Sequence, residues 1–312
     1  MSKKNLMHQA VLCPLCRLSQ NQLWAKARDV EYFTTQEIYS YYHCLHCEIL
    51  FIDPVPVDKL NIIYPTNYYS FAPENQSTIH KIKVWLDTSV FKNTLKRINK
   101  EQINILDVGG GTGWLLSAIK KVDDRIKITQ IVDFDPSAAA LAEKQGHQYF
   151  CGRFEEFMTD RKFELILLLN LIEHVQNPID ILEKCKSILS PEGRILIKTP
   201  NWDSLDARLF RHKNWGGYHC PRHWTLFTKR SFETMVNHLG LKVDLFQYTQ
   251  GAPFWTISVC AWLAQRKWIT VTKEKPMYQH PVYSLFNVIF AAFDFLRLTF
   301  FPTSQMTFLL KK

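Results

Sequence analysis

Glycine is scarce in this chain, and no segment is of low complexity or repeats at a fixed period. The 312 residues include 11 glycines and 14 prolines, which excludes a collagen-like or low-complexity protein. Acidic residues are outnumbered, since 38 lysines and arginines accompany 29 aspartates and glutamates. Aromatic residues make up 13% of the chain, enough core material to exclude intrinsic disorder. At roughly 100 to 200 residues per domain, the length predicts about two domains.

The N-terminus lacks the apolar run and the small-residue cleavage site of a secretory signal, although it carries two lysines. We therefore expect a cytoplasmic protein. In that reducing compartment the eight cysteines are not expected to form a disulfide framework.

From residue 103 onward, short runs rich in leucine or β-branched residues alternate with helical patterns. Strands are expected at 103–108, 126–133, 163–170, 194–199 and 241–248. Helices are expected at 114–121, 136–145, 178–189 and 229–239. This succession predicts a parallel sheet with helices on both faces and ligands at the carboxyl ends of the strands.

The strand at 103–108 leads directly into residues 109–113 (GGGTG) and then into a helical segment that begins at Trp114. A glycine-rich turn before a helix N-terminus lets the backbone approach a ligand, with N–H groups that point at it. The dinucleotide fingerprint requires a third glycine where this chain has Trp114, and a P-loop requires a Lys-Ser/Thr pair after the loop. A dinucleotide is therefore disfavoured and a P-loop is excluded.

Asp133 and Asp135 follow the second strand, about twenty residues after the glycine loop. A carboxylate at this position can accept hydrogen bonds from both ribose hydroxyls of an adenosine. The alternative is that both aspartates only cap the helix that Pro136 opens. We expect Asp133 to end the strand and bind ribose, and Asp135 to cap the helix.

Four segments resemble the ordered motifs of class I S-adenosylmethionine-dependent methyltransferases: ILDVGGGTG, VDFDPSAAALAEKQG, FELILLLNLIEHVQNP and ILSPEGRILIKTPN. The resemblance covers roughly residues 103–248. It implies a Rossmann-like, doubly wound α/β fold with a mostly parallel seven-stranded sheet. It also implies that the cofactor contacts Asp107, Gly109, Gly111, Gly113, Asp133, Phe134, Phe154, Asn170 and Leu171. Residues 151–154 (CGRF) depart from the family, because many members carry an acid before the residue that contacts adenine.

Three histidines lie where this fold places the methyl acceptor: His174, His219 and His223. Histidine is the usual base when an acceptor must lose a proton near neutral pH. The loop that carries the last two resembles the tryptophan-to-histidine segment of a methyltransferase subfamily found in cell-surface glycan and natural-product pathways. In the alternative interpretation, His223 holds the loop by hydrogen bonds and His174 lies in the floor of the site.

Two CxxC pairs, Cys13/Cys16 and Cys44/Cys47, are separated by residues 17–43 and suit a tetrahedral zinc site. The alternatives are two unrelated dipeptides or a redox pair. The segment resembles the zinc ribbon that precedes the methyltransferase domain of sugar C-methyltransferases, with residues 64–70 (YPTNYYS) similar to their linker. Basic and acidic residues balance within this segment, which argues against nucleic-acid binding.

Residues 254–263 and 282–301 are dominated by aromatic and aliphatic side chains. The first run is too short to span a bilayer, and Asn287, Asp294 and Arg297 interrupt the second. We expect a hydrophobic helical insertion before a last strand at 304–310. Three interpretations remain: peripheral contact of 254–301 with the inner face of a membrane, packing on the protein body, or a homodimer face.

These patterns predict three parts: a zinc ribbon and irregular linker (1–78), a methyltransferase domain that opens with a helix at 79–99 (79–250), and the insertion with the closing strand (251–312). The favoured function is methyl transfer from S-adenosylmethionine to a sugar or a lipid-linked or cell-surface glycan precursor. The alternatives are O-methylation of a quinone-like lipid, which Glu173-His174-Val175 also resembles, a nicotinamide-dependent oxidoreductase, and a noncatalytic zinc-ribbon adaptor.

The basic bias is concentrated toward the C-terminus. Residues 201–312 carry 14 lysines and arginines but six acidic residues, which accounts for +8 of the formal net charge of +9. This location favours a phosphate-bearing acceptor or an anionic membrane over a nucleic acid.

Overall fold

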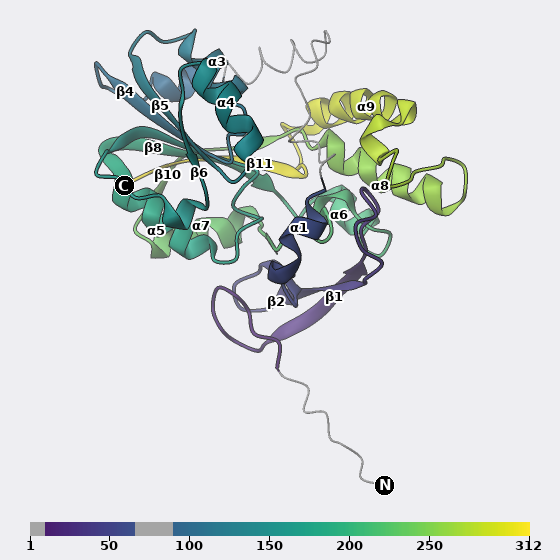
Figure 1. Cartoon of the computed structure of the whole chain (residues 1–312). Coiled ribbons are helices and arrows are strands. Elements are labelled where there is room, and N and C mark those ends of the chain that lie inside the picture. The colour runs from purple at the N-terminus through teal and green to yellow at the C-terminus, as the bar shows by residue number, and fades with distance from the viewer. Residues whose placement is uncertain (1–9, 66–89) are drawn as a thin grey trace.

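The computed structural model describes residues 10–65 and 90–312. They form a seven-stranded sheet with the order β10-β11-β8-β7-β4-β5-β6 and a four-stranded sheet with the order β1-β2-β3-β9. Figure 1 shows the smaller sheet below the larger one, with helices α8 and α9 to one side. Most of the expected linker at 64–70 and residues 79–89 of the expected helix at 79–99 lie outside the described residues. Residues 90–95 of that expected helix are helical.

The larger sheet has a parallel centre and an antiparallel edge. Its parallel strands are β4 (Ile103–Val108), β5 (Ile126–Asp133), β6 (Gln148–Cys151), β7 (Phe163–Leu169) and β8 (Leu189–Pro200). The antiparallel strands are β11 (Gln305–Lys311), which pairs with β8, and β10 (Lys242–Thr249), which pairs with β11. The predicted α/β fold with a mostly parallel seven-stranded sheet is confirmed.

Helices connect these strands in the predicted order: α3 (Trp114–Lys120), α4 (Pro136–Lys144), α5 (Pro178–Ile188) and α7 (Lys229–His238). One boundary was wrong, since β8 begins at Leu189 rather than at residue 194. Leu189 pairs with Phe163, and the register then resumes at Arg194, so residues 190–193 bulge from the strand. A bulge of this kind hides an early strand start from sequence patterns.

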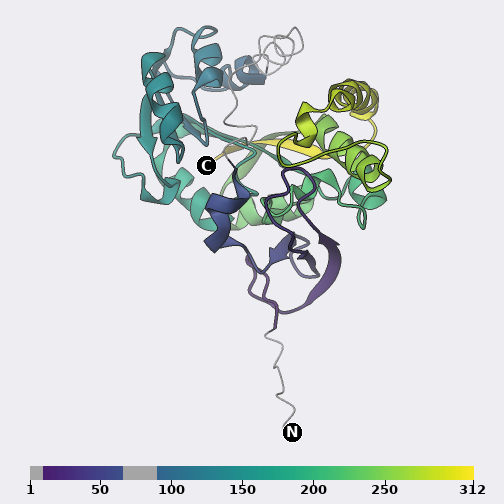
Figure 2. The same ribbon diagram turned by 45° about the vertical axis from the view of Figure 1, so that its right-hand side comes forward.

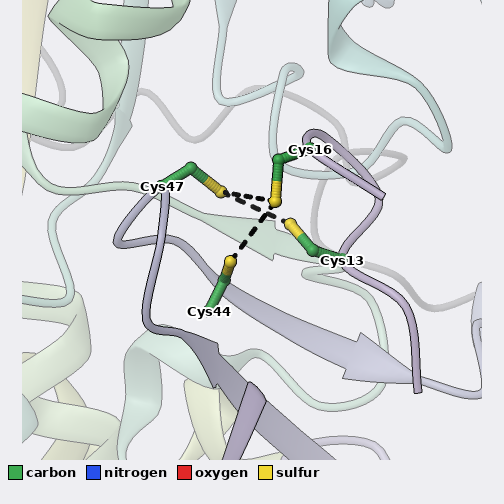
Figure 3. Close-up of side chains that lie close together, drawn as sticks. All are labelled: Cys13, Cys16, Cys44 and Cys47. Carbon is green, nitrogen blue, oxygen red and sulfur yellow. Dashed lines mark hydrogen bonds between the residues drawn. The ribbon is translucent and has the colours of Figure 1, made fainter. Parts of the chain in front are cut away.

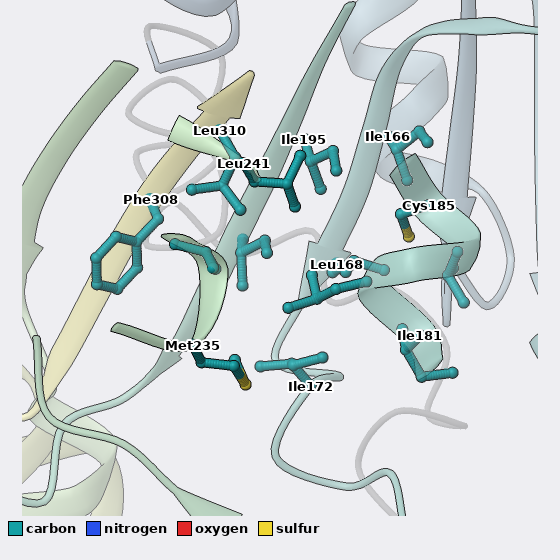
Figure 4. Packing of buried hydrophobic residues seen from close by; sticks show 14 of the residues in the cluster. Ile166, Leu168, Ile172, Ile181, Cys185, Ile195, Met235, Leu241, Phe308 and Leu310 are labelled. Carbon is teal, nitrogen blue, oxygen red and sulfur yellow. The ribbon is translucent and has the colours of Figure 1, made fainter. Parts of the chain in front are cut away.

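The main hydrophobic core fills the space between the sheet and helices α5 and α7 (Figure 4). Ile166 and Ile195 come from neighbouring parallel strands, Ile181 comes from α5, and Phe232 of α7 stacks on Phe308 with ring centres 4.4 Å apart. Full burial stabilises each such side chain by about 1.5–3 kcal/mol. The core thereby holds the carboxyl ends of the strands, which carry the candidate site, in a fixed arrangement.

The N-terminal module (residues 10–65) contains β1 (Asn21–Ala27), β2 (Tyr39–Cys44), β3 (Leu50–Asp53), η1 (Val57–Lys59) and α1 (Leu60–Ile63). Its sheet is completed by β9 (Thr225–Leu226), which follows β8 much later in the chain and pairs with β3. The aromatic residues between the two CxxC pairs fall partly within this sheet: Tyr39, Tyr41 and Tyr42 lie in β2, whereas Tyr32 and Phe33 lie outside the strands. The division at residues 78 and 250 stays a prediction.

The insertion between β10 and β11 consists of α8 (Ala252–Gln265), η5 (Met277–Gln279) and α9 (Pro281–Arg297). It confirms the expected helical insertion before the last strand. Figure 2 shows the two helices as a hairpin beside the larger sheet. Within residues 10–65 and 90–312, no helix combines the length and the apolar character needed to cross a bilayer.

Candidate active site and metal centre

The glycine loop joins the carboxyl end of β4 to α3. Gly109, Gly111 and Gly113 have φ angles of 78°, 50° and 78°, a region that side chains with a β carbon rarely adopt. A β carbon at Gly113 would lie 2.6 Å from the His147 ring, whereas one at Gly111 would meet no atom of residues 10–65 and 90–312 within 4 Å. The loop is therefore packed against the protein at Gly113 and open beside Gly111, where a ligand can lie against the backbone.

Asp107 is buried at the end of β4, against the turn of the glycine loop. A β carbon at Gly110 would lie 2.7 Å from its Oδ2 atom. Burial, together with the nearby charge of Asp133, raises the pKa of Asp107 to about 7. A cation that binds beside such a carboxyl favours its ionised form, so Asp107 suits a ligand with an ammonium group.

Asp133 and Asp135 make different contacts, and the contacts of Asp135 bear on its expected role as a helix cap. The Asp133 carboxylate accepts hydrogen bonds from the backbone N–H of Gly111 at 2.9 Å and of Asp135 at 3.0 Å. Asp135 accepts from the N–H of Ser137 at 2.9 Å and is the N-cap of α4, which confirms the capping prediction. Burial raises the pKa of Asp133. The bond to Gly111 places the Asp133 carboxylate beside the open side of the glycine loop.

The remaining predicted cofactor residues differ in their position relative to the glycine loop and in their burial. Leu171 borders the loop, because a β carbon at Gly109 would lie 3.2 Å from its Cδ1 atom. Phe134 is 58% exposed, and Asn170 accepts a hydrogen bond from the Gln305 amide at 2.6 Å. Phe154 differs from these, because its side chain is buried in the main core.

The three candidate histidines come together. His223 is central, with its ring centre 4.6 Å from that of His174 and 5.0 Å from that of His219. His174 follows the end of β7, whereas the other two lie in the histidine loop, which we define as residues 215–224. The structure therefore places side chains that are about fifty residues apart in one cluster near the carboxyl edge of the larger sheet.

Two of these histidines are held in the neutral form. Burial, followed by the neighbouring histidines, lowers the pKa of His223 well below its usual value, and its Nδ1 atom lies 2.8 Å from the Gly217 carbonyl oxygen. Burial lowers the pKa of His174 to about 3, and its Nδ1 atom lies 3.0 Å from the Tyr64 hydroxyl. Both imidazoles are therefore weak bases.

Glu173 lies beneath the cluster and is fully buried. Its Oε2 atom accepts a hydrogen bond from the Thr199 hydroxyl at 3.0 Å, and its Oε1 atom lies 3.9 Å from His223 Nε2. Burial raises the pKa of Glu173 to about 8, so the carboxyl is mostly protonated at neutral pH. The backbone carbonyl of Glu173 accepts a hydrogen bond from Trp224 N–H at 2.7 Å, which fixes the histidine loop to the end of β7.

Two acids of the N-terminal module contact the histidine loop, and no sequence pattern indicated this contact. Glu31 Oε1 lies 2.8 Å from His219 Nδ1. Asp29 accepts a hydrogen bond from Arg222 at 2.9 Å, and both side chains of this pair are fully buried. Burial raises the pKa of Asp29, but Arg222 and several hydrogen bonds outweigh it and hold the pKa below its usual value.

His219 itself has an unusual backbone conformation, with φ of 36°. Non-glycine residues in the left-handed region cost roughly 1–3 kcal/mol and are enriched at functional sites. The contact with Glu31 helps to hold the ring of His219 in this position. No sequence spacing could reveal the pair, because 188 positions separate the two residues.

The four cysteines of the CxxC pairs face one another at one end of the N-terminal module (Figure 3). The Sγ–Sγ distances are 3.4 Å for Cys13–Cys47, 3.6 Å for Cys16–Cys44 and 3.8 Å for Cys16–Cys47. Four sulfurs about 2.3 Å from a tetrahedral zinc ion lie about 3.8 Å apart. The hydrogen bond from Cys47 lowers the pKa of Cys13 to about 5 and raises that of Cys47, and burial raises the pKa of Cys16 to about 11. Cys13 is therefore the thiolate of the cluster before a cation binds.

Within the described residues, two groups of side chains could hold a metal ion. One is the cysteine cluster. The other consists of Glu173, His174 and His223, whose nearest ligand atoms also lie within 4.8 Å of one another. Thiolates at these spacings are the characteristic ligands of structural zinc, and the cysteine cluster fits that ion.

The comparison with known families now places the chain in a class. A family described as "Methyltransferase domain" matches residues 85–245, which is just over half of the 312 residues. The chain therefore belongs to this methyltransferase family. This membership disfavours the oxidoreductase and adaptor alternatives.

Among curated relatives, the chain is similar to the ubiquinone biosynthesis O-methyltransferase of Bradyrhizobium sp. (strain ORS 278). The two are 29% identical over 173 residues, which cover 49% of this chain and 65% of the relative. The mitochondrial ubiquinone biosynthesis O-methyltransferase of Arabidopsis thaliana is 27% identical over 113 residues, 32% of this chain and 33% of the relative. The chain thus spans less than two thirds of the length of these relatives.

Solved structures support the fold. Coclaurine N-methyltransferase bound to N-methylheliamine and SAH is 14% identical, with a TM-score of 0.52 over 82% of each chain. A putative sarcosine dimethylglycine methyltransferase from Galdieria sulphuraria is 13% identical, with a TM-score of 0.54 over 76% of this chain and 89% of that chain. At this level of identity the likeness concerns the fold alone.

Proposed function

We propose that the protein transfers a methyl group from S-adenosylmethionine to a hydroxyl group of a quinone-like lipid. The observation that carries this proposal is how two groups of residues lie relative to the strands of the methyltransferase domain. An open glycine loop flanked by Asp107 and Asp133 and a buried histidine cluster follow the carboxyl ends of neighbouring parallel strands. The lipid acceptor is supported by the curated relatives, which are named for ubiquinone biosynthesis.

The residues around the glycine loop fit this cofactor. Two backbone N–H groups hold the Asp133 carboxylate at the edge of the loop. Its remaining lone pairs would accept hydrogen bonds from the ribose hydroxyls. Asp107 would face the ammonium group of the methionine moiety, and the open side of Gly111 would receive the cofactor. When bound, S-adenosylmethionine supplies a methyl group attached to a positively charged sulfur.

We assign the role of general base to His219, with Glu31 as its positioning partner. Because Nδ1 of His219 is held by Glu31, the ring takes the acceptor's proton at Nε2, and the Glu31 carboxylate stabilises the resulting imidazolium. The acceptor oxygen then forms a bond to the methyl carbon as the carbon–sulfur bond breaks and its electron pair moves to sulfur. His174 and His223 are less suited to this step because burial lowers their pKa and makes them weak bases.

A sugar or glycan precursor is the second candidate acceptor. The cysteine cluster favours it, because this module resembles the zinc ribbon of sugar C-methyltransferases and its four sulfurs have zinc-like spacing. The relatives named for ubiquinone biosynthesis favour the quinone-like lipid instead.

A product assay separates the two acceptors. The protein is incubated with S-adenosylmethionine and either a hydroxylated hydroquinone with an isoprenoid tail or a nucleotide-linked sugar, and the products are identified by mass spectrometry. We expect one added methyl group on the hydroquinone and none on a matched compound whose hydroxyl is already methylated. Methylation of the sugar alone would overturn the lipid assignment.

We also propose that Cys13, Cys16, Cys44 and Cys47 hold one structural zinc ion. We expect about one zinc per chain in the purified protein and its loss in Cys44→Ser, because three thiolates leave a tetrahedral site incomplete. Cys151→Ser is the matched control, since Cys151 is an exposed free cysteine outside the cluster. Elemental analysis checks both variants, and an unchanged zinc content in Cys44→Ser would contradict the four-cysteine site.

A further inference from the structure

The outer face of α9 and the turn after it form an exposed apolar surface. Its largest side chains are between 42% and 77% exposed: Leu285, Val288, Ile289, Phe293, Phe295, Leu296, Phe300 and Phe301. We call these eight residues the α9 surface. Most of them recur at intervals of three or four positions, so they share one side of the helix. A contiguous apolar surface of this kind marks an interaction site rather than ordinary surface variation.

The charged residues that interrupt this apolar run in the sequence do not reach the α9 surface. Asp294 is fully buried and accepts a hydrogen bond from Gly251 N–H at 2.7 Å. Arg297 is 8% exposed, and its guanidinium lies 5.8 Å from the centre of the Trp255 ring. Residues 281–301 contain no other charged side chain. The two charged residues that argued against a bilayer-spanning segment are therefore directed into the protein.

A basic loop joins α8 to α9 and adjoins one end of this surface. Residues 266–275 carry four exposed basic side chains and one acidic side chain, Glu274. The same loop contains Trp268, which is 68% exposed. Basic residues near a membrane are attracted to anionic headgroups, and tryptophan is enriched at the level of those headgroups. The positive charge of this loop therefore complements an anionic bilayer.

The hairpin of α8 and α9 also packs directly on the histidine loop. Gly216 N–H donates a hydrogen bond to Ser258 of α8 at 2.8 Å, and a β carbon at Gly216 would lie 2.4 Å from the Phe254 carbonyl oxygen. The Phe254 ring lies 6.5 Å from that of His223. Figure 1 shows α8 between α9 and the body of the protein. A membrane at the α9 surface would thus be one helix layer away from the histidine loop.

We propose that the α9 surface inserts into the headgroup and acyl boundary of an anionic bilayer, with the basic loop 266–275 on the lipid headgroups. This is the geometry of an interfacial helix that lies in the membrane plane. The inference deepens the proposed function, on which it rests, because an acceptor with an isoprenoid tail resides in the bilayer. It gives the hairpin the task of bringing the histidine cluster to that acceptor.

Co-sedimentation with lipid vesicles tests the proposal on the full-length protein. We expect binding to vesicles that contain phosphatidylglycerol and weaker binding to pure phosphatidylcholine. We also expect weaker binding at high salt, because salt screens the headgroup contacts but not the inserted apolar side chains. The triple variant Phe295→Ser/Leu296→Ser/Phe300→Ser is expected to lower the vesicle partition coefficient more than about tenfold. Met158→Ser is the matched control, because Met158 is 85% exposed but lies on the methyltransferase body.

Three outcomes would overturn the membrane assignment: no binding of the wild type to anionic vesicles, equal binding by the triple variant, or a concentration-dependent dimer that the triple substitution dissociates. Circular dichroism shows whether each variant is folded. A short-chain, water-soluble hydroquinone separates this proposal from the proposed function. If the protein methylates this compound but does not bind vesicles, the membrane surface is rejected and the activity stands. If the protein binds vesicles but methylates neither this compound nor the hydroquinone with an isoprenoid tail, the activity is rejected and the membrane surface stands.

Discussion

Replacing His219 by alanine is expected to lower kcat by about 10²–10⁴-fold, the range over which positioned general bases contribute. Affinity for S-adenosylmethionine is expected to change little, because the cofactor residues surround the glycine loop rather than the histidine loop. Glu31→Gln is expected to lower kcat to a smaller extent. The amide can still accept a hydrogen bond from Nδ1, but it no longer stabilises a charged imidazolium.

His223→Ala provides the comparison within the same cluster. Because burial and two neighbouring histidines lower the pKa of His223 and make it a weak base, its loss is expected to reduce kcat less than the loss of His219. Steady-state kinetics over a range of pH distinguishes a base from a structural residue. The assignment of His219 is wrong if His223→Ala is the more damaging variant, or if Glu31→Gln leaves the pH profile of kcat unchanged.

The sequence was sufficient to predict the part of the fold that depends on local patterns. The bounds of β4 and β5 match their predicted ranges, because each strand is a short apolar run that ends at a turn or a cap. Asp135 could be predicted as an N-cap for the same reason, since Pro136 follows it directly. The start of β8 could not be predicted, because residues 190–193 leave the register.

The contacts that complete the site are long-range and carry no local signal. Asp29 and Arg222 are separated by 193 positions, yet they form a fully buried ion pair between the N-terminal module and the histidine loop. The inward orientation of the Asp294 and Arg297 side chains depends on how α9 packs against α8, and the sequence pattern could not predict it. The burial of Phe154 likewise follows from the packing of the core around it.

The cofactor site gives the second large expected effect. Asp133→Ala removes a carboxylate that already accepts two backbone N–H groups at the glycine loop and would accept two ribose hydroxyls. Hydrogen bonds to a charged group contribute about 1.5–3 kcal/mol each, so two of them correspond to a loss of affinity of roughly 10²–10⁴-fold. Asp135→Ala removes only the cap of α4, which costs about 1 kcal/mol of stability.

Calorimetric titration of S-adenosylmethionine into the wild type and these two variants tests the central claim most directly. We expect the wild type and Asp135→Ala to bind with similar affinity, and Asp133→Ala to bind at least about a hundredfold more weakly. An absence of binding to the folded wild type, or an equal effect of the two substitutions, would contradict the assignment of this glycine loop and Asp133 as the site of the methyl donor.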